Sequence, residues 1–263
     1  MALIVLTSAS GSPGVTTTAV ALALTWDRPV LLLEADPTGG SAILAGYFRG
    51  QATAPDSLID LVLAHRDGAL LETIPSVAMQ VPDSTVTFIP GTRSHAQARS
   101  VATLWEPLTT ALTYLDELGE DVIVDAGRLG LTGSPEALLH AADLALLVTR
   151  TDLVALAGAR SWAHTLTGAF AAQGVSDSFG VLTVGQGRPY GTREVANVLT
   201  APVVATLAWD DSSAAVFARG ATPPARLDRT PLLRSLRSAQ DAITTRVRAN
   251  TARLAPSPVG GVS

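Results

Sequence analysis

Short, unbroken apolar runs recur along this chain and are separated by longer segments of mixed character. Runs such as Pro-Val-Leu-Leu-Leu and Asp-Val-Ile-Val-Asp are continuous rather than alternating, which is typical of strands buried on both faces of a sheet. Their alternation with helical segments predicts an α/β protein with a doubly wound, mostly parallel sheet and helices on both faces. The predicted strands are residues 2–7, 29–34, 85–89, 121–125, 143–149, 179–184 and 203–207.

Helices are predicted between and after these strands. Pro90-Gly91 ends one strand, and the order Ser134-Pro135 predicts a helix start with Ser134 as its cap. We expect residues 1–250 to form one domain and residues 251–263, which are rich in Pro, Gly and Ser, to form a flexible tail. The predicted helices are residues 16–26, 56–65, 96–118, 135–141, 152–172, 191–199, 212–219 and 231–250.

The last predicted helix, residues 231–250, is amphipathic and basic. A helix of this kind can lie on a membrane surface, but this one has no Phe or Trp on its apolar face, and one apolar position is only alanine. We therefore expect it to pack on the sheet, with membrane contact as the alternative. Its apolar face is Leu232, Leu233, Leu236, Ala239, Ile243 and Val247, and its basic face is Arg234, Arg237, Arg246 and Arg248.

Composition narrows the class of protein. The 263 residues are 47% hydrophobic, which excludes disorder for most of the chain, and a net charge of −5 gives no bulk attraction for nucleic acid or anionic lipid. No apolar run reaches the ~18 residues that span a bilayer, and the uncharged start lacks the basic residues of a signal peptide. We expect a cytoplasmic protein. There are no cysteines, and the four histidines are scattered without ligand spacing, so no metal-ligating cluster is predicted.

Residues 9–18 carry the most informative chemistry, with the sequence Ala-Ser-Gly-Ser-Pro-Gly-Val-Thr-Thr-Thr. This segment lies between a predicted strand and a predicted helix, where a phosphate-binding loop belongs. The usual pattern ends in Gly-Lys-Ser/Thr, and Val15 stands at the lysine position. All 18 basic residues of the chain are arginine, so no lysine from elsewhere, or from an identical subunit, can replace it.

Two further segments follow in order: Leu31-Leu32-Leu33-Glu34-Ala35-Asp36-Pro37-Thr38-Gly39-Gly40 and Asp121-Val122-Ile123-Val124-Asp125-Ala126-Gly127. Each is an apolar strand that ends in an acidic residue. Together with the loop, they resemble the MinD/ParA family of deviant-P-loop ATPases, whose loop reads Lys-Gly-Gly-x-Gly-Lys-Thr-Thr. The resemblance covers roughly residues 2–240. It extends to the strand and helix between Ala142 and Arg160, and to a segment like the family's Ile-Pro-x-Asp between Val203 and Arg219.

The resemblance implies a damaged nucleotide site. Ser10 stands where the family's signature lysine reaches the partner's phosphates, Ser12 replaces a glycine, and Val15 replaces the phosphate-binding lysine. Pro13 lacks an N–H and should push Ser12 toward extended geometry. The loop residues that match the family are Gly11, Gly14, Thr16 and Thr17.

Other parts of the site are retained under the same resemblance. Thr16 matches the residue that contacts Mg²⁺, Asp125 the residue that holds the ion through water, and Asp36 the acidic residue near the attacking water. Alternatively, Asp36 and Asp125 are simply caps or turn residues. Arg128 and Arg150 follow strand ends on the ligand-binding side of such sheets, where either can supply positive charge or remain a solvated surface residue.

The sequence thus indicates a catalytically degenerate protein with no catalytic residues assigned. The resemblance implies a non-hydrolysing spatial regulator or assembly scaffold, similar to the TadZ and CpaE proteins that position pilus or secretion machinery, with protein partners and a homodimer. The alternative is an ATP-binding switch for chromosome or plasmid partitioning or septum placement, in which an arginine replaces the lysine. A ligase or kinase on the same fold is a third candidate. Binding of ATP or ADP with Mg²⁺ is left open, and no direct binding to nucleic acid is expected.

Overall fold

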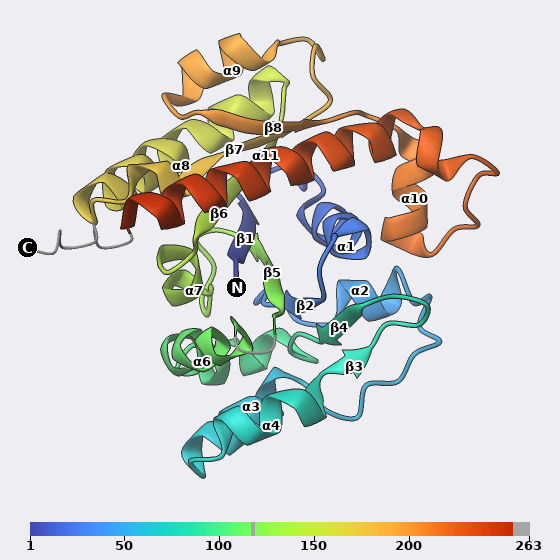
Figure 1. The fold of residues 1–263 in the computed structure, drawn as a ribbon, viewed down its shortest axis with the longest axis vertical. Helices are drawn as coiled ribbons and strands as arrows, with labels where there is room; N and C mark the ends of the chain where they lie inside the picture. The colour runs from blue at the N-terminus through green and yellow to red at the C-terminus, as the bar shows by residue number, and fades with distance from the viewer. Residues whose placement is uncertain (117–118, 255–263) are drawn as a thin grey trace, which may run out of the picture.

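The centre of the molecule is an eight-stranded sheet, seen in a computed structural model that describes residues 1–116 and 119–254 (Figure 1). The strand order is β3-β4-β2-β5-β1-β6-β7-β8, and every neighbouring pair is parallel except β3 with β4. All seven predicted strands are confirmed, and the two-residue β3 is the one that was missed. The strands are β1 Leu3–Ser8, β2 Val30–Glu34, β3 Met79–Gln80, β4 Val86–Ile89, β5 Asp121–Arg128, β6 Leu144–Arg150, β7 Phe179–Val184 and β8 Val203–Leu207.

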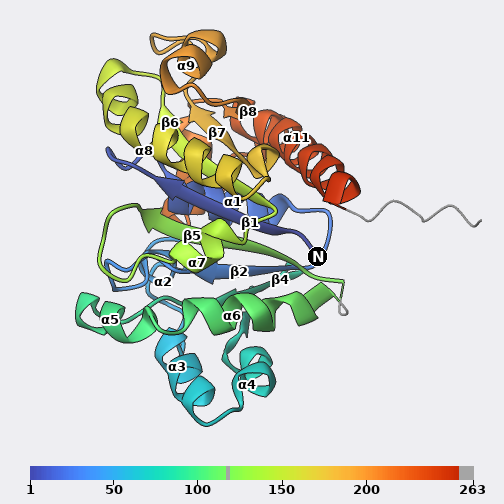
Figure 2. The same ribbon diagram turned by 90° about the vertical axis from the view of Figure 1, so that its left-hand side faces the viewer.

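The two faces of the sheet bury separate hydrophobic cores. Successive side chains of a strand point to opposite faces, so Leu3 and Val5 of β1 enter one core while Ile4 and Leu6 enter the other. One core is covered by α3 Leu58–Arg66, α4 Leu70–Val77, α5 Ala98–Val101, α6 Trp105–Leu112, α7 Glu136–His140, α8 Leu153–Ala172 and α9 Thr192–Leu199. The other is covered by α1 Val15–Thr25, α2 Ala42–Ala45, α10 Asp211–Arg219 and α11 Pro231–Leu254. Figure 2 shows helices on both sides of the sheet, as the apolar runs predicted.

Several predicted helix boundaries were wrong. The helix predicted at residues 96–118 is a series of short helices, of which α5 and α6 are the α-helical parts, and residues 117–118 lie outside the described part of the chain. Pro107 lies in the first turn of α6, where its missing N–H needs no partner, whereas inside a helix running from residue 96 it would break the hydrogen-bond ladder. Ser134 does not cap α7, because its hydroxyl donates to the Leu131 carbonyl instead. The short α2 and the Pro75-containing α4 were not predicted.

Helix α11 lies along the sheet beside β8, and the prediction that it packs there is confirmed (Figures 1 and 2). All six predicted apolar residues, Leu232, Leu233, Leu236, Ala239, Ile243 and Val247, are buried in the core beneath it. The helix continues to Leu254, four residues beyond its predicted end at 250, and residues 255–263 of the predicted tail lie outside the described residues. Among the described helices, none has the length and apolar character needed to cross a membrane.

Candidate functional site

The loop between β1 and α1 forms a tight reversal from strand into helix. Gly11, Ser12 and Gly14 all have positive φ values, of 76°, 45° and 100°. The prediction that Pro13 forces Ser12 into extended geometry is therefore wrong, because the direction change required by the loop overrides the local preference. Ser12 adopts a left-handed conformation that costs a non-glycine residue about 1–2 kcal/mol, at the position where the related loop pattern has a glycine.

The start of α1 is suited to an anion. Gly14 precedes the helix without a side-chain cap, and the first turn contains no acidic residue. The uncapped N–H groups and the helix dipole both favour negative charge at this point. A cleft of about 590 Å³ opens in front of this turn, lined by Gly11, Ser12, Gly14, Val15, Thr16 and Thr17 together with Asp36 and Arg128. The predicted loop residues and Asp36 thus meet in one cleft.

Val15 belongs to the core as much as to the cleft. It is 6% exposed and packs with the apolar cluster beneath α1. Its short side chain presents no donor to an anion at the helix start. The position that matches a phosphate-binding lysine has therefore become a packing position.

Ser10 is directed toward its own chain. Gly158 of α8 faces it so closely that a methyl group on Gly158 would collide with the Ser10 hydroxyl. The absence of a side chain at Gly158 is what lets the loop approach α8. Ser10 therefore contacts its own α8 at the position that matches a lysine reaching across to a partner.

Asp125 is the most perturbed acid of the site. It is fully buried at the end of β5, and its Oδ1 accepts the Gly127 N–H at 3.1 Å, while Oδ2 makes no hydrogen bond of ordinary geometry among the described residues. Burial raises the pKa of this carboxyl to about 7. The Thr16 hydroxyl opposes the rise, while the charges of Glu34 and Asp36 add to it. A buried oxygen without a good donor, beside a threonine hydroxyl, fits a hydrated divalent cation.

Glu34 is a residue that sequence reasoning passed over. It is the register partner of Asp125 on the adjacent strand, and burial raises the pKa of its carboxyl. Its oxygens accept the N–H groups of Ile43 and Gly91 at 3.2 and 3.0 Å, so it anchors the start of α2 and the loop after β4. The available signal was its place as the last residue of an apolar strand.

Asp36 has two roles in the structure. Its Oδ1 accepts the Thr38 N–H at 2.9 Å, which is the turn contact that the alternative interpretation expected. Its carboxyl also lines the cleft and lies against Gly127. The turn bond positions the carboxyl for the cleft, so the two interpretations are compatible.

Gly127→Ala should disturb this carboxyl. Gly127 has φ +59°, and a β-carbon there would collide with the Asp36 carboxyl, so we expect strain of about 1–2 kcal/mol and a further 1–3 kcal/mol from overpacking. Gly119→Ala is the control, since its φ is +72° but, apart from its chain neighbours, no atom of the described residues lies within 4 Å of the added carbon. Thermal unfolding of the two variants measures the difference. Equal losses would mean that Asp36 moves aside freely.

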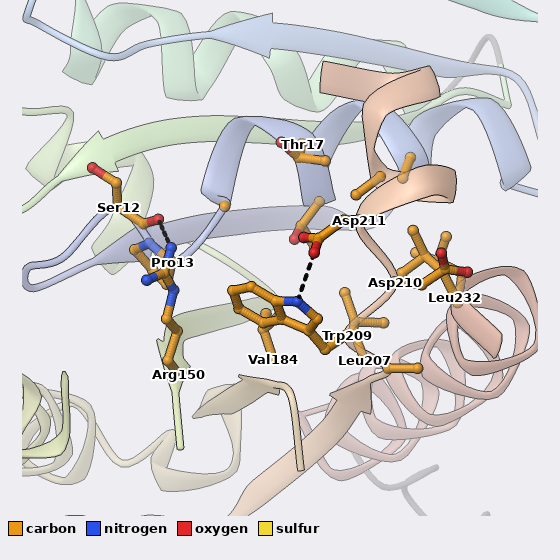
Figure 3. A pocket seen from close by; sticks show the side chains of 16 residues that line it. Ser12, Pro13, Thr17, Arg150, Val184, Leu207, Trp209, Asp210, Asp211 and Leu232 are labelled. Carbon is orange, nitrogen blue, oxygen red and sulfur yellow. Dashed lines mark hydrogen bonds between the residues drawn. The ribbon is translucent and has the colours of Figure 1, made fainter. Parts of the chain in front are cut away.

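The two candidate arginines lie on different sides of the loop. Arg128 is exposed and lines the cleft in front of α1. Arg150 donates to the Ser12 carbonyl at 3.2 Å and stacks 5.2 Å from the Trp209 ring, in a separate cavity of about 250 Å³ (Figure 3). Arg128 is therefore the arginine that lines the cleft in front of α1, whereas Arg150 lines the second cavity, whose wall also includes Gly14 and Thr17.

The second cavity was not predicted. Its mostly apolar wall includes Val184, Leu207 and Trp209, and the Trp209 indole N–H donates to Asp211 at 3.2 Å (Figure 3). Asp210 caps α10 through Ser213. Because Ser12 and Pro13 line this cavity as well, the loop separates an apolar cavity from the polar cleft. This is the layout of a site for a ligand with a flat apolar part and an anionic part.

A strand–loop–helix cradle at the carboxyl edge of a mostly parallel sheet defines a P-loop type of fold. No protein-family model matches the chain, and neither does any curated protein sequence. Among solved structures, the septum site-determining protein MinD of Pyrococcus horikoshii, complexed with Mg-ADP, matches with TM-score 0.69 and 16% identity, covering 95% of this chain and 99% of that one.

Two other solved structures have the same arrangement. McdA of Cyanothece in complex with ATP matches with TM-score 0.69 and 18% identity over 93% of this chain and 96% of that chain. The MinC–MinD cell division complex of Aquifex aeolicus matches with TM-score 0.67 and 14% identity over 98% of each. The chain therefore has the fold of the MinD and ParA ATPases, as the sequence motifs predicted.

Proposed function

We propose that this protein is a positioning or scaffold protein of the MinD/ParA fold that acts through protein contacts and does not hydrolyse ATP. The observation that carries the proposal is that Ser10 and Val15 stand at the two positions where the related loop has lysines. The chain contains no lysine elsewhere that could replace them. Val15 is packed into the core and Ser10 lies against α8, so neither side chain offers charge to a phosphate. The TadZ and CpaE proteins, which position pilus or secretion machinery, are the model for this role.

The loss affects turnover more than binding. A charged hydrogen bond to phosphate contributes about 1.5–3 kcal/mol, so one lost lysine weakens binding by about 10- to 150-fold. Hydrolysis depends on positive charge placed around the developing transition state. Thr16 and Asp125 would hold a Mg²⁺-bound nucleotide, whose metal supplies charge to the phosphates. The uncapped start of α1 would hold the phosphate oxygens.

The second candidate is an ATP-dependent positioning switch, and the placement of Arg128 favours it. Arg128 is the one cation among the described residues that line the cleft. An arginine there can bind a phosphate through two N–H groups, although its rigid fork differs from the compact ammonium of lysine.

We expect no ATPase activity above background in the purified protein. Phosphate release and calorimetry with ATP and ADP, each with and without Mg²⁺, measure turnover and binding separately. Turnover that disappears in Asp36→Ala or Asp125→Ala would overturn the scaffold proposal. Nucleotide binding that weakens in Arg128→Gln but not in Arg150→Gln, together with such turnover, would establish the switch.

We also expect a homodimer that forms without ATP. Leu153 and Val154 begin α8 beside the loop and are 66% and 81% exposed, which offers apolar area for contact at the loop face. A double change of these two residues to serine should shift the dimer toward monomer in light scattering across a concentration series. Leu63→Ser in α3, at a residue 51% exposed, is the matched control. A monomer at every concentration, or a dimer that needs ATP, would contradict this expectation.

A further inference from the structure

A cavity of about 440 Å³ lies at the edge of the sheet opposite the loop. It is bounded by the starts of β1 and β5, by the segment that follows α1, and by the second half of α11. Figure 2 shows the start of β1, marked N, on the same side of the sheet as the end of α11. The volume is in the range of about 300–1,000 Å³ that small-molecule sites occupy. Because the strands are parallel, this cavity is separated from the nucleotide cleft by the length of the sheet.

Part of the polar lining is already paired. Asp121 accepts three donors: the Ala2 N–H at 2.8 Å, the Trp26 indole N–H at 2.9 Å and the Arg28 guanidinium at 3.1 Å. Arg28 also donates to the Gly119 carbonyl at 2.9 Å. These contacts hold the Trp26 ring in the cavity wall. Asp121 and Arg28 are therefore structural parts of the wall, held by their contacts with each other and with the backbone.

Other lining groups have no partner within the described part of the chain. Gln240 of α11 is only 5% exposed, yet its side-chain amide makes no hydrogen bond there. The amide faces the open cavity, so water reaches it, and a ligand in the cavity can replace that water with hydrogen bonds of its own. At the exposed rim, Asp27 and Arg248 carry opposite charges, and neither has an ion-pair or hydrogen-bond partner among the described residues.

We propose that this cavity binds a zwitterion with an apolar body, of about dipeptide size. The apolar body packs against Ile4, Trp26 and Val247, which form the nonpolar part of the wall. The ligand's ammonium meets Asp27, its carboxylate meets Arg248, and its peptide group bonds with the Gln240 amide. A ligand with a single charge would satisfy one rim group and be repelled by the other, so the opposite charges of the rim select a zwitterion.

Calorimetry with the dipeptide leucyl-phenylalanine tests the proposal on the full chain. Its N-acetylated form lacks the positive charge, and its C-terminal amide form lacks the negative charge. We expect the unmodified dipeptide to bind more tightly than either, by about 2- to 5-fold for each charge, since both rim residues are exposed. Asp27→Asn should abolish the preference over the acetylated form alone. Arg248→Gln should abolish the preference over the amide alone.

Matched variants keep this test specific. Arg234→Gln and Asp241→Asn remove exposed charges of α11 that do not line the cavity, and should leave all three affinities unchanged. Gln240→Leu should weaken binding of the dipeptide by about 2- to 10-fold, because the amide no longer bonds with the ligand's peptide group. Absence of binding at millimolar dipeptide, or equal affinities for the three forms, would overturn the proposal without bearing on the nucleotide cleft.

Discussion

Replacing Leu236 by alanine should lower the free energy of unfolding by about 2–5 kcal/mol, because a fully buried leucine leaves both lost apolar contact and a cavity. Leu236 is 0% exposed and lies in the core between α11 and the sheet. Ile243, about two turns further along α11, is buried to the same extent, and Ile243→Ala should give a loss of similar size. Chemical denaturation of the purified variants measures the change.

The control for Leu236→Ala is Leu63→Ala in α3, which makes the same chemical change at a side chain that is 51% exposed. This control should cost much less. The result also separates the two interpretations of α11. If Leu236→Ala keeps the stability of the parent protein but stops sedimenting with anionic vesicles, the helix acts on membranes and our assignment of it to the core is wrong.

The Asp125→Asn variant should be more stable than the parent protein at pH 8, and the advantage should shrink as the pH falls. The pKa of Asp125 is raised from 3.8 to about 7, mainly by burial. Between these values the folded state binds more protons than the unfolded state, so stability falls as the pH rises through this window and is constant above it. The full penalty above pH 7 is of order 4 kcal/mol, and asparagine removes it because it does not ionise.

Thermal unfolding of both proteins between pH 4.5 and 8.5 measures this difference. Asp241→Asn, at an exposed position of α11, is the control and should show no pH-dependent gap from the parent. A gap between Asp125→Asn and the parent that is constant with pH would show that the carboxyl does not titrate in this range. Because Glu34 also has a raised pKa, the parent's own pH dependence includes a contribution from that residue that persists in the variant.

The stability cost of burying the Asp125 carboxylate bears on the proposed function. Asp125, Glu34 and Asp36 concentrate three acids beside the start of α1, where burial raises the pKa of Asp125 and repulsion from the other two acids adds to the rise. A cation or a ligand with bound Mg²⁺ would relieve that repulsion. Under the proposed function, this arrangement would serve binding rather than turnover. Stabilisation by Mg²⁺ and ADP that disappears in Asp125→Asn would be the corresponding observation.

The strands and the position of the loop between β1 and α1 were predictable from the sequence alone. Leu3 to Ser8 and the other apolar runs are buried on both faces of the sheet, so their burial appears as unbroken hydrophobic sequence. The absence of a lysine from the loop was equally clear. To recognise it, one needs only the composition of the chain and the strand–loop–helix pattern. The apolar face of α11 also predicted its packing, because Leu236 and Ile243 recur at helical spacing and Val247 follows.

The distribution of the candidate side chains around the loop depends on tertiary contacts and could not be predicted from the sequence. Arg128 and Arg150 both follow strand ends, but one faces the cleft and the other reaches Ser12 and Trp209. The positive φ of Ser12 overrides the preference that Pro13 imposes, and Gly158 admits Ser10 from far along the chain. These features depend on contacts between segments distant in sequence. The pattern of hydrophobic and polar residues in a segment indicates its burial and its secondary structure. The direction in which a side chain points depends instead on the elements that pack around it.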